Sequence, residues 1–107
     1  MKVVITRSAR RPGITDDEIR AVLAHPIVRY RVTPRLAPGA DVFRAIGDPD
    51  SGSIIEVVAE NVVGSGIHVF HAMLLTTGVA HEILDVTGGI IDLTGAAARR
   101  QRRGGEQ

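Results

Sequence analysis

The strongest constraint on the fold of this chain is a series of short alternating segments between Val42 and Met73, joined by turns that contain glycine. Alternation of apolar and polar residues with a period of two is typical of β-strands that bury one face. Asp, Pro, Ser and Gly dominate Asp48–Gly52, and glycine recurs in Val63–Gly66, as in tight turns. Consecutive strands with short turns predict an antiparallel meander. Strands are expected at 42–47, 53–60 and 67–73.

A helix is predicted before this meander, because Thr15 and Glu18 have the spacing of a capping box. In this motif the threonine hydroxyl accepts a hydrogen bond from the third helical amide, and the glutamate accepts one from the cap. Apolar residues follow at helical spacing, and Pro26 is expected to end the helix after His25. The next stretch, 27–33, alternates again and predicts a further strand.

These elements predict an α+β domain in which an N-terminal helix packs on a four-stranded antiparallel sheet, with a short C-terminal helix at 79–84. Residues 2–6 are predicted to form a short edge strand, and 88–93 a last strand or an extended arm. We expect a single domain over residues 1–96. The basic tail, residues 97–107, is expected to be disordered.

Composition excludes several classes of protein. The chain has no cysteine, and therefore no disulfide, no thiolate metal ligand and no cysteine nucleophile. No apolar run approaches the ~20 residues that cross a bilayer, and the first residues lack the apolar core of a secretory signal. A soluble, cytoplasmic protein without cofactor or metal is predicted. The net charge of only +1 does not itself indicate nucleic-acid binding, although 12 of the 13 basic residues are arginine.

The strand alternation nevertheless gathers charged residues on one predicted face of the sheet. RNA can be cleaved without metal when a base activates the ribose 2′-hydroxyl, an acid protonates the leaving 5′-oxygen and a cation stabilises the phosphorane. Glu56 and His71 are candidates for the two proton-transfer roles, and Arg44 is a candidate for the cation. Candidates for binding RNA are Arg29 and Arg31, expected on the same face, and Arg35.

The same pattern has a structural interpretation that the sequence leaves open. An antiparallel sheet often exposes one charged face to water, and cross-strand ion pairs there stabilise by only ~0.2–1 kcal/mol. His68 and His71 are three residues apart and are therefore expected on opposite faces of their strand. This spacing is unfavourable for a shared metal ion.

Three motifs resemble small bacterial toxins of type II toxin–antitoxin pairs, related to the BrnT and RelE-like toxins. They are ITDDEIRAVLAHP at 14–26, IGDPDSGSIIEVV at 46–58 and HVFHAM at 68–73. The resemblance implies a RelE/BrnT-like fold and metal-independent cleavage of mRNA, free or on the ribosome. It also implies a cognate antitoxin protein as partner. A homodimer remains open, and no membrane partner is expected.

The chain departs from these relatives directly after Met73. Where they continue with a basic segment of the type R-P-K-Y, this chain has Leu74–Gly78, and its next cation is His81. The alternative is therefore a non-catalytic module that binds protein or RNA and retains the toxin-like fold.

Overall fold

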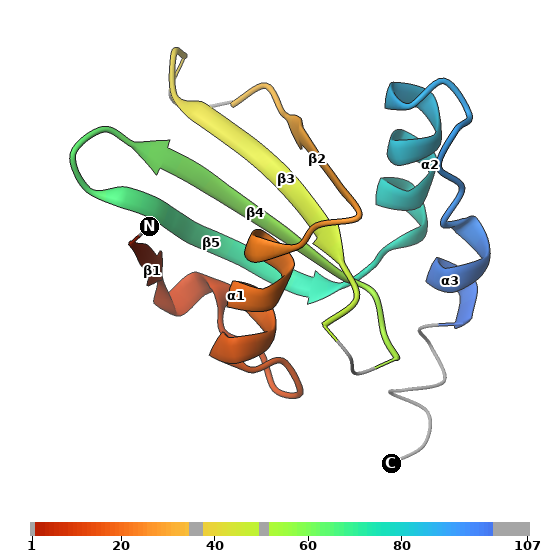
Figure 1. Ribbon diagram of the computed structural model, residues 1–107, viewed down its shortest axis with the longest axis horizontal. Coiled ribbons are helices and arrows are strands. Elements are labelled where there is room, and N and C mark those ends of the chain that lie inside the picture. Colours follow the sequence, from red (N-terminus) through yellow and green to blue (C-terminus); the bar gives the residue numbers. More distant parts are fainter. Residues whose placement is uncertain (1, 35–37, 50–51, 100–107) are drawn as a thin grey trace.

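The described residues form a five-stranded mixed sheet with one helix on one face and two helices against the other. The structure, a computed structural model, describes residues 2–34, 38–49 and 52–99. The strand order is β1-β5-β4-β3-β2. Figure 1 shows the elements, which are β1 (Val3–Ile5), η1 (Arg7–Ala9), α1 (Asp16–Ala24), β2 (Val28–Arg31), β3 (Asp41–Gly47), β4 (Ile55–Val62), β5 (Gly66–Leu74), α2 (Thr77–Val86) and α3 (Thr94–Arg99).

Strands β2 to β5 form the predicted antiparallel meander, and β1 adds a fifth strand parallel to β5. The predicted edge strand at 2–6 is confirmed as β1, and with it the sheet is five-stranded and mixed rather than four-stranded and antiparallel. β1 pairs with the free edge of β5, where the Ile67 amide donates to the Lys2 carbonyl at 2.9 Å. Gly66 allows this approach: it has φ of +111°, and a Cβ there would lie 2.4 Å from the Lys2 oxygen.

Helix α1 begins at the predicted capping box. The Thr15 hydroxyl accepts from the Glu18 amide at 3.1 Å, and the Glu18 carboxylate accepts from the Thr15 amide at 2.9 Å. The buried side of α1 packs on one face of the sheet and forms the first core. Its largest buried members include Ile19, Val22, Ile55, Val57 and Val69.

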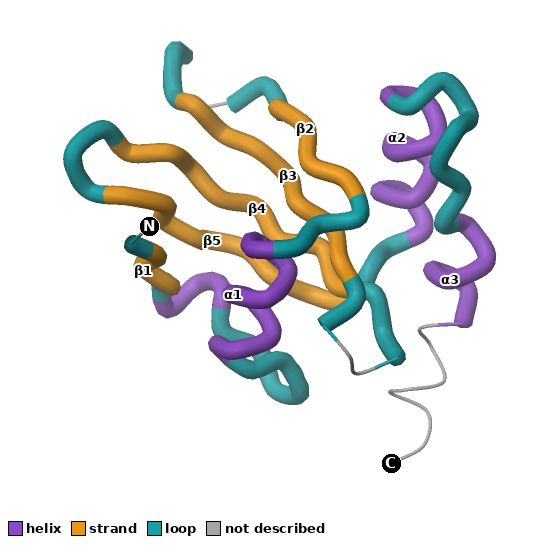
Figure 2. The backbone as a smooth tube through the Cα atoms, viewed as in Figure 1, coloured by secondary structure: helices purple, strands orange, loops and turns teal. Residues whose placement is uncertain are grey.

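A second core lies on the opposite face of the sheet, under α2 and α3. Figure 2 shows these two helices side by side and apart from α1. Helix α2 is longer than the predicted segment 79–84, and residues 88–93 form no strand. Residues 97–99, assigned to the tail from the sequence, belong to α3, while 100–107 lie outside the described residues. The second core contains Ile46, Leu75, Ala80, Ile83 and Ala97.

The two faces of the sheet are named here by their helices. The α1 face carries Phe43, Ala45 and Val57, whereas the α2 face carries Arg44, Ile46 and Glu56. Because Arg29 and Arg31 were predicted to share a face with Glu56 and His71, the apolar side chains of β2 were expected on the α1 face, and this is wrong. Tyr30 lies opposite Arg44 in the register, and both Val28 and Tyr30 pack in the second core. Because helices cover both faces, apolar side chains of one strand need not belong to the same core as those of the next.

In the part of the chain that the structure describes, no helix has the length and apolar character needed to cross a membrane.

Candidate functional site

Glu56 and His71 meet on the α2 face, as the sequence predicted. The imidazole Nε2 lies 3.1 Å from Oε1 of Glu56. The Glu56 side chain is only 4% exposed, while the His71 side chain is 28% exposed. The pair therefore joins a buried carboxylate to a ring that reaches solvent, a geometry in which the ring alone can touch a ligand.

The other oxygen of Glu56 is held by Thr76, which the sequence analysis missed. The Thr76 amide and hydroxyl both donate to Oε2 of Glu56, each at 2.9 Å. Burial alone raises the pKa of Glu56, but the bonds from His71 and Thr76 outweigh it and hold this pKa below its usual range. Glu56 is therefore an ionised acceptor in the folded protein.

The ionised carboxylate fixes the orientation of the imidazole. An ionised carboxylate only accepts hydrogen bonds, so the Nε2 atom of His71 carries the proton in this contact. In the neutral ring the second nitrogen, Nδ1, is then the basic atom. A buried acid that orients an imidazole in this way is a common arrangement for general-base chemistry.

Arg44 lies on the α2 face but its guanidinium is engaged elsewhere. In the register Arg44 lies opposite Val58, and Val58 lies opposite His71. The Cα atoms of Arg44 and His71 are thus about 10 Å apart, two strand spacings. Arg44 Nη1 bonds to the Glu82 carboxylate and, at 3.4 Å, to the Tyr30 hydroxyl. These partners lie in α2 and β2, away from β4 and His71.

Tyr30, Arg44 and Glu82 form a compact polar cluster between the sheet and α2. The Tyr30 hydroxyl donates to Oε1 of Glu82 at 2.5 Å. Burial, assisted by this bond, raises the pKa of Tyr30 to about 12. The cluster fixes α2 on the sheet. In this arrangement the Glu82 carboxylate binds the Arg44 guanidinium, which was expected to face a substrate.

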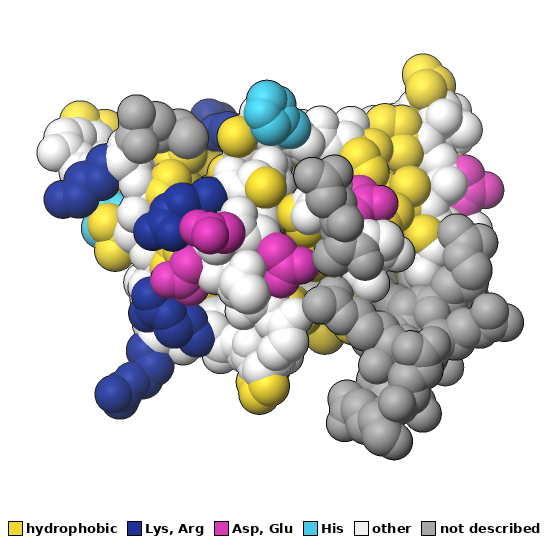
Figure 3. All heavy atoms as spheres, turned by 60° about the horizontal axis from the view of Figure 1, so that its bottom comes forward, with side chains coloured by type: hydrophobic (Ala, Val, Ile, Leu, Met, Phe, Trp, Pro, Cys, Tyr) yellow, Lys and Arg dark blue, Asp and Glu magenta, His cyan; other side chains and the backbone are white. Residues whose placement is uncertain are grey.

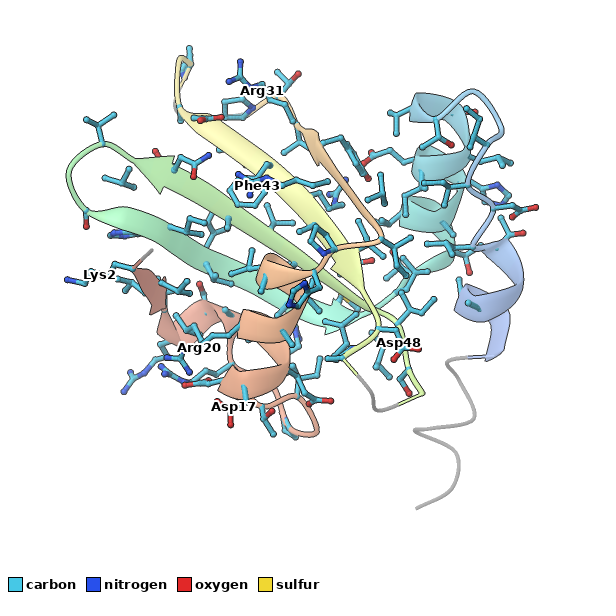
Figure 4. All side chains as sticks on the ribbon, in the orientation of Figure 1. Lys2, Asp17, Arg20, Arg31, Phe43 and Asp48 are labelled. Carbon is cyan, nitrogen blue, oxygen red and sulfur yellow. The ribbon has the colours of Figure 1, made fainter. Side chains whose placement is uncertain are left out.

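The predicted RNA-binding arginines do not join Glu56 and His71. Arg29 and Arg31 lie on the α1 face, where the Arg29 guanidinium stacks 3.7 Å from the Phe43 ring centre and Arg31 pairs with Asp41 at 3.2 Å. The prediction that they share a face with His71 is wrong, because Tyr30 and not an arginine of β2 lies opposite Arg44 in the register. Figure 4 labels Arg31 on β2 and Phe43 on β3. Arg35 lies outside the described residues.

A β-bulge changes the position of His68. Val58 pairs with His71 but Ala59 pairs with Val69, so Phe70 is an extra residue in β5. Glu60 pairs with His68, which places His68 and His71 on the same face, contrary to the prediction from their spacing. His68 Nε2 lies 2.7 Å from the Ser65 hydroxyl. Among the described residues, no group of three or more His, Cys, Asp or Glu has the arrangement of a metal site.

The missed members of the site have partial sequence signals. Thr76 is the N-cap of α2 and accepts from the Val79 amide at 3.3 Å, a pattern that Ser and Thr favour. Nothing in the sequence connects this cap with a glutamate 20 residues earlier.

Comparison with known proteins assigns this chain to no family. No protein-family model, curated protein or solved structure matches this chain.

Proposed function

We propose that this protein is a toxin-like, metal-independent endoribonuclease in which His71 is the general base. One observation carries the proposal: the partly exposed imidazole of His71 is bonded to a buried, ionised Glu56. The contact gives an imidazole, a side chain able to accept a proton, a fixed orientation. The finer likeness to the BrnT and RelE-like toxins is part of the same proposal.

The reaction is a transfer of the phosphodiester to the neighbouring ribose oxygen. Nδ1 of His71 takes the proton of the 2′-hydroxyl, and the 2′-oxygen forms a bond to phosphorus. The bond from phosphorus to the 5′-oxygen breaks, and this oxygen takes a proton from water. The products are a 2′,3′-cyclic phosphate and a 5′-hydroxyl, and the imidazolium returns its proton to solvent. No metal is needed because no step requires more than proton transfer and charge stabilisation.

Glu56 acts in this scheme as a positioning residue. Both of its oxygens are used, one by His71 and one by Thr76, so its contribution is to hold the ring and to stabilise the imidazolium. Arg44 supplies the cation only when a substrate phosphate replaces the Glu82 carboxylate. A cognate antitoxin is the proposed protein partner, and mRNA is the proposed substrate.

The experiment compares cleavage of a single-stranded ribo-oligonucleotide by the wild-type protein, H71A, E56Q and H68A in the presence of EDTA. H68A is the matched control because His68 lies on the same face but contacts Ser65. Loss of cleavage in H71A, a reduced rate in E56Q and an unchanged rate in H68A support the proposal. Equal rates in the wild type and H71A overturn it. A substrate with deoxyribose at the cleaved position should be inert, because it lacks the 2′-hydroxyl.

A non-catalytic binding module is the second candidate. It is favoured by the engagement of Arg44 with Glu82 and by the apolar continuation after Met73, in which Leu75 is fully buried. Growth on expression distinguishes the two candidates. An active nuclease toxin arrests growth and its H71A variant does not. A binding module has the same effect on growth as its H71A variant.

A further inference from the structure

Phe70 differs from the other aromatic residues of the chain. The three aromatic residues, Tyr30, Phe43 and Phe70, all lie in the described part of the chain. Tyr30 is engaged by Glu82, and Phe43 is 3% exposed beneath Arg29. Phe70 is 39% exposed and belongs to neither apolar core, although β5 is an interior strand of the sheet. Its ring is therefore available to a ligand.

The β-bulge explains the position of this ring. Phe70 is the extra residue of β5, between Val69, which is fully buried in the first core, and His71 on the α2 face. A bulge interrupts the alternation of side chains and redirects the residue it adds, and bulges are frequent beside active sites. In this protein the redirected residue is an aromatic one, and it directly precedes the proposed general base.

The backbone at this bulge is held by the N-terminal segment. Thr6 donates its amide and its hydroxyl to the Val69 carbonyl at 3.0 and 2.8 Å, and the Ser8 hydroxyl donates to the Phe70 carbonyl at 2.9 Å. These bonds place η1 alongside the bulge, and Arg7 of η1 is exposed. Figure 3 shows several Lys and Arg side chains on one side of the molecule, with Asp and Glu side chains beside some of them. A fixed aromatic residue thus adjoins a basic segment.

We propose that Phe70 is a stacking platform for one nucleobase of single-stranded RNA, next to the ribose whose 2′-hydroxyl His71 deprotonates. This inference rests on the proposed function and names its substrate class. Phe70 and His71 are consecutive residues, with Cα atoms about 3.8 Å apart. In the proposed complex one nucleotide contacts Phe70 through its base and His71 through its sugar-phosphate. In the same proposal the exposed Arg7 of η1 contacts an adjacent phosphate. Duplex RNA is a poor substrate, because its bases are stacked on one another and cannot reach the ring.

The test uses the absence of tryptophan from the natural chain. F70W carries a single indole at the platform, and V63W carries one at the tip of the β4–β5 turn, where Val63 is fully exposed. Both are titrated with a single-stranded ribo-oligonucleotide and with the same sequence as a duplex. We expect the fluorescence of F70W, but not of V63W, to be quenched by the single strand, and the duplex to have little effect. Equal quenching of both variants, or equal quenching of F70W by both RNAs, overturns the inference.

A second measurement separates this inference from the nuclease proposal. F70A should bind the single strand on the order of tenfold more weakly, and F70Y should retain binding. If the wild type cleaves no RNA but F70W is selectively quenched, the nuclease proposal fails and the platform remains. If the wild type cleaves RNA and F70A shows the same KM for single strands, the platform fails and the nuclease remains. Circular dichroism of F70A and F70Y checks that both are folded.

Discussion

Thr76 donates two hydrogen bonds to a single oxygen of Glu56, from a position 20 residues later in the chain. The same threonine hydroxyl accepts from the Val79 amide at the start of α2. One residue therefore fixes both the first turn of a helix and the carboxylate that orients His71. The stability of α2 and the geometry of the candidate site share this contact.

Substitution of Thr76 tests this coupling. T76V keeps the shape of the side chain but removes the hydroxyl, and we expect it to lower the free energy of unfolding by about 2–3 kcal/mol, since a cap and a hydrogen bond to a charged group are lost. T76S retains both contacts and should remain close to the wild type. Urea unfolding measures the difference. A T76V protein as stable as T76S would show that the contact contributes nothing.

The ionisation of Glu56 predicts a pH dependence of stability. Its pKa is lower in the folded protein, so the stability it contributes is present above the usual glutamate value of about 4.3 and is lost as pH falls through the lowered native value. E56Q should therefore lose stability less steeply than the wild type on acidification below about pH 5. The measurement is the urea midpoint at a series of pH values. Parallel curves would contradict the prediction, since the remaining carboxylates are common to both proteins.

Tyr30 is the only tyrosine of the chain and gives a direct spectroscopic readout. Burial, with the bond to Glu82, raises its pKa to about 12. Phenolate absorbance should appear about two pH units later in the native protein than in urea, where an ordinary tyrosine titrates near about 10. The associated stability is complete below the unfolded pKa and is lost as pH rises toward the native value. E82Q should reduce the difference in pH between the native and the unfolded titration of Tyr30. Coincident titrations of the native and the unfolded wild type would refute the prediction.

The contact between Arg44 and Glu82 predicts opposite effects on stability and on RNA binding. E82Q removes the charge that holds a guanidinium whose side chain is only 19% exposed, so we expect a loss of about 1 kcal/mol. Under the proposed function it also frees Arg44 for phosphate, and the affinity for single-stranded RNA should rise. D85N is a matched charge change, because Asp85 is an exposed residue of the same helix. Equal gains of affinity in E82Q and D85N would show that the gain comes from the change in net charge and not from the release of Arg44.

Alanine substitutions of Gly66 and Gly64 distinguish the cost of backbone strain from the cost of a steric conflict. Both have positive φ, +111° and +79°, but only Gly66 faces the Lys2 carbonyl, whereas space at Gly64 is open. G64A should cost about 1–2 kcal/mol from strain alone. G66A should cost more, because β1 must move away from β5. Thermal melting measures both, and equal losses would mean that the edge strand tolerates a side chain at this point.

The local elements of the fold were predictable because their determinants lie within a few residues. The Thr15–Glu18 capping box, the end of α1 and the glycine-containing turn between β4 and β5 belong to this class. Long-range relationships were not. The pairing of β1 with β5 depends on which edge is free, and the register of β2 depends on a loop with two prolines rather than on a tight turn.

The candidate site divides in the same way. The alternation of β4 and β5 correctly placed Glu56 and His71 on one face, since the pairs Glu56–Met73 and Val58–His71 lie on the same side of the bulge and keep a regular register. The same bulge, which periodicity does not reveal, reversed the expected face of His68. The face of Arg29 and Arg31 was mispredicted because a second helix covers the side of the sheet that was assumed to be open.

The pairing of β1 with β5 has a consequence for synthesis on the ribosome. The partners Val3 and Ile67 are 64 positions apart, so β1, the first strand of this sheet to be synthesised, waits for β5, the last. Until then the nascent chain carries an unsatisfied strand edge, the kind of surface on which polypeptides associate wrongly. Slow translation of the segment before Gly66 should therefore lower the yield of correctly folded protein more than slow translation after it.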